Sequence, residues 1–114
     1  MQFLIIGKDG HDDEAQKRRM VSRDEHLKLG DLMEKSGQRW YGCALLDDNG
    51  KMIGSMAVFD FSTEKELQNY LKKEPYILGK VWQTVEVYKC NVKNPWKFNR
   101  PQSFFEKRGY KKIT

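Results

Sequence analysis

Two arginines and a histidine lie close together in one segment of the chain, at Arg19, Arg23 and His26. Residues spaced by three and four share one face of an α-helix, so these side chains would project together. That face lies roughly 140° from the Lys- and Asp-rich sector that water would cover. Basic groups at the margin of an apolar surface need an acidic partner or a bound anion. The spacing therefore predicts that an acidic side chain or a bound anion contacts these three residues.

Asp9 is the acid that we expect to meet this helix, because it follows the apolar stretch QFLIIG. An acid beside a histidine fixes the tautomer and orients the ring, which suits general acid/base catalysis near neutral pH. Arginine presents planar pairs of N–H donors that match a carboxylate or an enolate. We predict a proton-transfer site in which His26 and Asp9 are catalytic and Arg19 and Arg23 bind the substrate. Structural ion pairs among the same residues are the alternative that spacing leaves open.

The elements that must position these side chains follow from periodicity and turn chemistry. The predicted strands are QFLIIG, RWYGCALL, MIGSMAVFDF and VWQTVEVYKC, with an Asn-Gly hairpin turn at Asp47–Gly50 between the second and third. The first helix is predicted to begin at Asp13, with Gln16 completing a capping box, and to have Lys35 in its last turn and Gly37 just beyond its end. The second is predicted from Thr63 to a stop before Pro75.

This order of elements, β-α-β-β-α-β, predicts an α+β ferredoxin-like fold, in which both helices cover one face of an antiparallel four-stranded sheet. The other face would be open, with Trp40, Trp82 and Tyr88 as candidates to supply apolar surface there. An exposed apolar sheet face is a typical interface. We therefore expect a homodimer that forms through this face.

The net charge of +5 belongs to the end of the chain. Residues 1–92, the predicted domain, hold 14 Lys/Arg and 15 Asp/Glu, whereas the extension 93–114 holds 7 and 1. The extension interleaves these basic residues with aromatic ones, at Trp96, Phe98, Phe104, Phe105 and Tyr110. This mixture can bind single-stranded nucleic acid. We favour docking on the partner subunit, because disordered segments are normally poor in aromatic residues.

Several classes of protein are not expected from this sequence. No apolar run approaches the ~20 residues of a membrane span and no leader is visible, so we expect a cytoplasmic protein with no membrane partner. Cys43 and Cys90 are isolated, which predicts neither a zinc site nor a disulfide. His11 stands next to two acids, but adjacent loop residues rarely converge on one ion. No metal or organic cofactor is expected.

Short motifs in the chain resemble the YCII-related (YciI-like) family. They are Arg19-x-x-x-Arg23-x-x-His26-Leu27 after Asp9, Tyr41-Gly42, Gly54-Ser55 and Glu74-Pro75-Tyr76. The likeness covers residues 1–92 and implies a ferredoxin-like subunit of a dimeric α+β barrel, with a His-Asp pair in the active site. His26 matches the family's histidine, and we take Asp9 as its partner. Glu74 and Tyr76 are expected at the mouth of the site, as substrate-binding residues.

The resemblance also implies a reaction class. The family looks related to muconolactone-isomerase-type enzymes and has been linked to dehydrochlorination, so it implies a lyase- or isomerase-like proton transfer on a small anionic substrate. The chain differs where the family has Ala-Gly-Pro, at Tyr41 to Cys43, and where it has Asp-Pro-Tyr, at Glu74 to Tyr76. The alternative function is a non-catalytic dimeric module whose tail binds nucleic acid or a protein partner.

Overall fold

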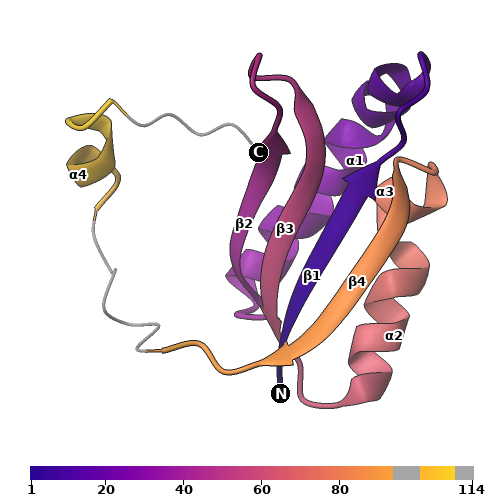
Figure 1. Ribbon diagram of the computed structural model, residues 1–114. Helices are drawn as coiled ribbons and strands as arrows, with labels where there is room; N and C mark the ends of the chain where they lie inside the picture. Colours follow the sequence, from indigo (N-terminus) through magenta and orange to yellow (C-terminus); the bar gives the residue numbers. More distant parts are fainter. Residues whose placement is uncertain (94–100, 110–114) are drawn as a thin grey trace.

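The computed structural model describes residues 1–93 and 101–109. Its elements are β1 (Gln2–Asp9), α1 (Ala15–Lys35), β2 (Arg39–Leu46), β3 (Met52–Asp60), α2 (Glu64–Lys73), α3 (Pro75–Leu78), β4 (Trp82–Cys90) and α4 (Gln102–Glu106). The four strands form one antiparallel sheet in the order β2-β3-β1-β4. Figure 1 shows α1 and α2 on the same side of this sheet. The predicted ferredoxin-like fold is confirmed.

Helix α1 begins later than its sequence signal predicted. Asp13 was the expected N-cap, but the residue before the helix is Glu14, whose side chain makes no capping hydrogen bond. The neighbouring Asp12 carboxylate instead accepts two hydrogen bonds from Arg18, at 2.6 and 2.8 Å. The end agrees with the prediction, because Gly37 has a φ of 82°. This left-handed conformation is one that a residue without a Cβ adopts readily.

Helices α2 and α3 meet at Glu74. The start of α2 has the predicted capping box, in which Thr63 Oγ1 accepts a hydrogen bond from the Glu66 backbone N–H at 3.2 Å. The Pro75 ring ends α2 and opens α3, a turn of helix that follows the predicted stop of the second helix. Glu74 is the N-cap of α3, and its side chain accepts from the Tyr76 backbone N–H at 3.0 Å. The backbone therefore holds the Glu74 carboxylate at a fixed place.

The core lies between the helices and the sheet. It contains Phe3, Ile5, Met33, Ala57, Phe59, Phe61, Leu67, Tyr70, Tyr76, Val81 and Trp82. Trp82 was predicted on the open face, and this was wrong, since it is 6% exposed and a Cβ on Gly7 would overlap its ring. The reason is an irregularity in the β1–β4 register, where Lys8 pairs with Thr84 but Asp9 pairs with Trp82. The extra residue in β4 turns Trp82 to the face opposite Thr84.

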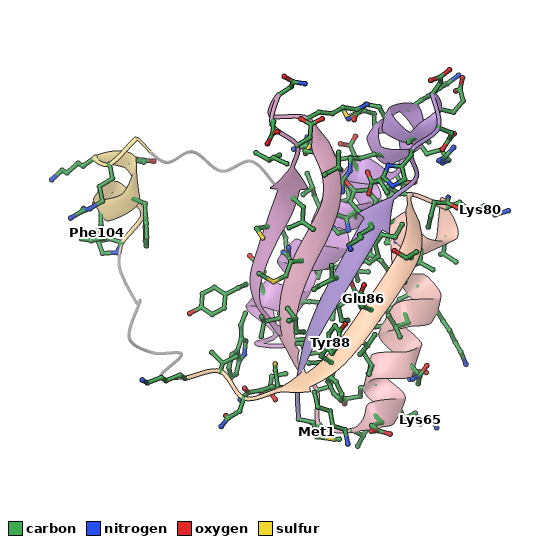
Figure 2. All side chains as sticks on the ribbon, viewed as in Figure 1. Met1, Lys65, Lys80, Glu86, Tyr88 and Phe104 are labelled. Atoms are coloured by element: carbon green, nitrogen blue, oxygen red, sulfur yellow. The ribbon has the colours of Figure 1, made fainter. Side chains whose placement is uncertain are left out.

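The other sheet face carries no helix in Figure 1. Its centre is apolar, formed by the half-buried Leu4, Ile6, Met56 and Val58. Figure 2 shows Glu86 and Tyr88 on β4 at this face, where the Tyr88 hydroxyl donates a hydrogen bond of 2.6 Å to Glu86. This is the surface on which the sequence predicts a second copy of the chain, and the homodimer stays a prediction.

The C-terminal extension is described only in part. Of its aromatic residues, Trp96, Phe98 and Tyr110 lie outside the described residues, so the predicted docking or nucleic-acid binding stays a prediction. Beside α4, the Arg108 guanidinium lies 3.7 Å from the centre of the Phe104 ring. In the described part of the chain, no helix combines the length and the apolar character that crossing a membrane requires.

Candidate active site

A narrow pocket lies where α1 and α3 meet the sheet. Its lining includes Arg19, Arg23, His26, Glu74 and Tyr76, five of the six residues that the sequence analysis singled out. The free space inside is about 20 Å³, room for about one water molecule. The flexible residues Arg39 and Met52 also line it. A larger ligand must therefore displace some of them.

His26 is held by Glu74 inside this pocket. The two side chains are 2.6 Å apart, from Nδ1 of His26 to Oε1 of Glu74. The Glu74 carboxylate is 2% exposed and also accepts hydrogen bonds from the Tyr70 hydroxyl at 2.6 Å and from the Tyr76 backbone N–H. A carboxylate that accepts hydrogen bonds from these two donors accepts one from His26 as well. The neutral imidazole then carries its hydrogen on Nδ1, the nitrogen that contacts Glu74. Nε2 is then the nitrogen that can take a proton.

Two aromatic rings fix the plane of the imidazole. The His26 ring stacks on Tyr76, with centroids 3.8 Å apart and an angle of 8° between the planes. The edge of Trp82 meets it at a centroid distance of 6.0 Å. The hydrogen bond to Glu74 and these contacts together restrict both rotation and displacement of the ring. An imidazole held in this way is oriented before any ligand binds.

The expected partnership of Asp9 with His26 is corrected by the structure. Asp9 pairs with Arg19, through bonds of 2.7 Å from Nε and 3.2 Å from Nη2. Both side chains are buried, at 4% and 3% exposure. His26 lies seven residues further along α1, about 10 Å along the helix axis. Arg19 therefore contacts Asp9 at the end of β1. The acid that contacts His26 is Glu74, at the junction of α2 and α3.

Most of the N–H donors of Arg19 are engaged by the protein itself. Besides Asp9, its guanidinium donates to the Gly54 carbonyl at 2.8 Å, to Ser55 Oγ at 2.9 Å and to the Tyr76 hydroxyl at 3.4 Å. Arg23 also lines the pocket and is half-buried, and the predicted substrate-binding role of the two arginines stays a prediction. Arg19 ties α1 to β1, β3 and α3 behind the site.

Two tyrosine hydroxyls of the site stay protonated near neutral pH. Burial raises the pKa of Tyr70, and the neighbouring Glu74 carboxylate raises it further. Burial also raises the pKa of Tyr76, although the charges of Arg19 and Arg23 act in the opposite direction. The Tyr70 hydroxyl is thus a permanent donor to Glu74, and the Tyr76 hydroxyl can donate to an anionic ligand.

Some residues of the site were missed from the sequence. Tyr70 lies four residues before Glu74 on the same helix face, a spacing that could have revealed it. Ser55, to which the sequence analysis gave no role in the site, accepts hydrogen bonds from Arg19 and from Trp82 Nε1. Arg39 comes from the start of β2, and no motif marked it. Within residues 1–93 and 101–109, no three His, Cys, Asp or Glu side chains cluster as metal ligands would.

Comparison with solved structures places this fold among known proteins. The chain is similar to 5-chloro-2-hydroxyhydroquinone dehydrochlorinase (TftG) from Burkholderia phenoliruptrix AC1100, which was solved in complex with 2,5-dihydroxybenzoquinone. The TM-score is 0.68 and the sequence identity is 19%, and the match covers 80% of this chain and 94% of TftG. It is also similar to Rv0793 from Mycobacterium tuberculosis, with a TM-score of 0.58, 8% identity and coverage of 82% and 99%. At these identities the likeness shows the fold alone.

Sequence comparison gives the family. No curated protein matches the chain significantly. The family model described as the YCII-related domain matches residues 1–96, which include every element from β1 to β4 and all the pocket residues named above. The chain therefore belongs to the YCII-related domain family.

Proposed function

We propose that this protein is a small-molecule enzyme in which His26 transfers a proton on a small anionic substrate, in a lyase- or isomerase-like reaction. The observation that carries the proposal is the 2.6 Å contact of His26 Nδ1 with the buried Glu74 carboxylate at the wall of a pocket. This contact leaves Nε2 as the base. The pair replaces the His26–Asp9 pair that the sequence predicted.

Glu74 has two tasks in this proposal. Its hydrogen bond keeps the imidazole in the tautomer whose Nε2 is unprotonated, and its negative charge stabilises the imidazolium that forms when Nε2 takes a proton. The family resemblance places an Asp at this position, so a Glu here keeps the carboxylate and lengthens its reach. Tyr70 is a positioning residue, since it holds Glu74 and makes no contact with His26 among the bonds shown.

The substrate's negative charge is met by Arg23 and by the Tyr76 hydroxyl. Arg23 precedes His26 by three residues, so the two side chains lie on one face of α1. A guanidinium binds a carboxylate or enolate oxygen pair in one plane, which orients the reacting atom toward the imidazole. The buried Asp9–Arg19 pair keeps this wall rigid rather than binding the substrate itself.

The reaction class is supported by the family and by one structural neighbour. A dehydrochlorination removes H⁺ and Cl⁻ from adjacent positions, so a base must take the proton while chloride leaves with the bonding electrons. The name and the bound ligand of TftG describe such chemistry on an oxygenated ring. A fixed imidazole beside an arginine supplies the base and the anion contact that this step needs.

The open sheet face supports a homodimer as the working form of the enzyme. Leu4, Ile6, Met56 and Val58 form its apolar centre. Burying these side chains against a second copy would stabilise the pair through the hydrophobic effect. An Ile6→Lys variant should then be a monomer by light scattering where the unchanged chain is a dimer. A monomer in both cases rules out this interface.

The experiment compares two histidine variants. Chloride release from 5-chloro-2-hydroxyhydroquinone, and deuterium incorporation from D₂O into 2,5-dihydroxybenzoquinone, are measured without oxygen for the unchanged protein, for His26→Gln and for His11→Gln. His11 is exposed and lies outside the pocket, so its variant is the matched control. Loss of a general acid/base should slow turnover by about 10²- to 10⁴-fold in His26→Gln only. Equal turnover by both variants, or no reaction of the unchanged protein with either compound, overturns the proposal.

A further inference from the structure

A second guanidinium lies at the wall of the same pocket, and no motif of the sequence marks it. Arg39, at the start of β2, lies against two glycines, Gly30 on α1 and Gly42 on β2. A Cβ at Gly30 would be 2.9 Å from Arg39 Nη1, and a Cβ at Gly42 would overlap Nη2. The absence of side chains at both positions makes the space that the guanidinium occupies.

The Arg39 guanidinium pairs with Glu34, an acid that is itself accessible to water. Its side chain is 10% exposed, and the hydrogen bond shown for it among the described residues joins Nη1 to Glu34 Oε1 at 2.8 Å. Glu34 is 46% exposed, so water competes for this bond. A guanidinium has five N–H donors. Arg39 therefore differs from Arg19, whose guanidinium donates hydrogen bonds to buried acceptors of the protein.

The positions along α1 place His26 between two cationic groups. Arg23 precedes His26 by three residues, and Gly30, which Arg39 contacts, follows it by four. Each step is about one helical turn, so Arg23 and Gly30 lie on either side of His26 along α1, roughly 10 Å apart along the axis. A ligand that contacts His26 Nε2 and spans the pocket would meet a guanidinium at each end.

We infer that this pocket selects ligands that carry two oxyanions at opposite ends, one bound by Arg23 and one by Arg39, and that Arg39 is the specificity-determining residue. The inference rests on the proposed function, since it takes the pocket of His26 as the substrate site. A ligand with one oxyanion uses Arg23 and leaves Arg39 with Glu34. A second oxyanion binds Arg39 inside the pocket in place of the half-exposed Glu34 carboxylate, through a charge-assisted hydrogen bond.

Titration calorimetry with two matched probes tests this inference. Terephthalate and benzoate share one ring and differ by one carboxylate. The unchanged protein should bind terephthalate about 10-fold or more tightly than benzoate, since one charge-assisted hydrogen bond contributes at least ~1.4 kcal/mol. Arg39→Gln should reduce this preference to within about 2-fold and leave benzoate binding unchanged. Arg18→Gln, at a partly exposed arginine outside this pocket, is the control and should keep the preference.

A second variant removes the guanidinium from its place without removing its charge. Gly42→Ala puts a methyl group where Arg39 Nη2 lies, and should abolish the preference as Arg39→Gln does. Equal weakening of both probes in Arg39→Gln would show that Arg39 only supports the wall, and no preference in the unchanged protein would overturn the inference outright. His26→Gln should keep the preference, so loss of catalysis and loss of selectivity are separate results.

Discussion

The buried pair of Asp9 and Arg19 provides the sharpest test of how this site is built. Replacing Asp9 by Asn keeps the size of the side chain and removes its charge. The Arg19 guanidinium then stays buried, at 3% exposure, with a neutral oxygen in place of a carboxylate. Breaking a buried ion pair by changing one partner costs about 3–5 kcal/mol. Because the Asn oxygen can still accept one hydrogen bond from Arg19, we expect a loss of about 3 kcal/mol.

The measurement is chemical denaturation at neutral pH, followed by circular dichroism, with Asp12→Asn as the matched variant. Asp12 binds Arg18 with similar bidentate geometry, at 2.6 and 2.8 Å, but this pair is far more exposed to water, at 53% for Asp12 and 27% for Arg18. Asp12→Asn should leave the denaturation midpoint nearly unchanged. Against the 5–15 kcal/mol that holds a typical domain together, the loss in Asp9→Asn is easily resolved.

Either of two results would refute this reasoning. If Asp9→Asn is as stable as Asp12→Asn, burial of the pair does not stabilise the junction of β1 and α1. If Asp9→Asn keeps its stability but loses turnover, Asp9 takes part in the chemistry as the sequence had suggested. Adding Arg19→Met to Asp9→Asn should restore part of the lost stability, because no charge then remains buried.

Two further predictions concern the walls of the pocket. Because the pKa of Tyr70 is raised on folding, the folded chain keeps this proton at alkaline pH values where the unfolded chain loses it. The free energy of unfolding should therefore fall above about pH 10, by up to ~1.4 kcal/mol per pH unit. The melting temperature of Tyr70→Phe should depend less steeply on pH in this range. Equal slopes would contradict this. Gly7→Ala should destabilise the protein by about 1–3 kcal/mol and shift tryptophan fluorescence, since the new methyl group overlaps the Trp82 ring; an unchanged melting temperature would show that the ring can move aside freely.

Much of the fold could be read from local signals. The Asn-Gly turn at Asp47–Gly50, the capping box at Thr63 and the left-handed Gly37 lie where the sequence predicted them. Such signals depend on a few neighbouring residues, so they do not require knowledge of the tertiary structure. Trp82 was misplaced because a register irregularity in β4 changes which face a residue takes, and alternation alone cannot reveal that shift.

Five of the six residues singled out in the sequence line one pocket, but their contacts differ from the predicted ones. The sequence by itself determined that Arg19, Arg23 and His26 share a face of one helix, because helical geometry fixes relative direction over a few turns. Only the tertiary structure decided that Asp9 binds Arg19, that Glu74 binds His26 and that Arg39 enters between two glycines. The physical reason is that a hydrogen bond tolerates a few tenths of an ångström. Contacts between distant segments at that precision depend on how the helices pack on the twisted sheet.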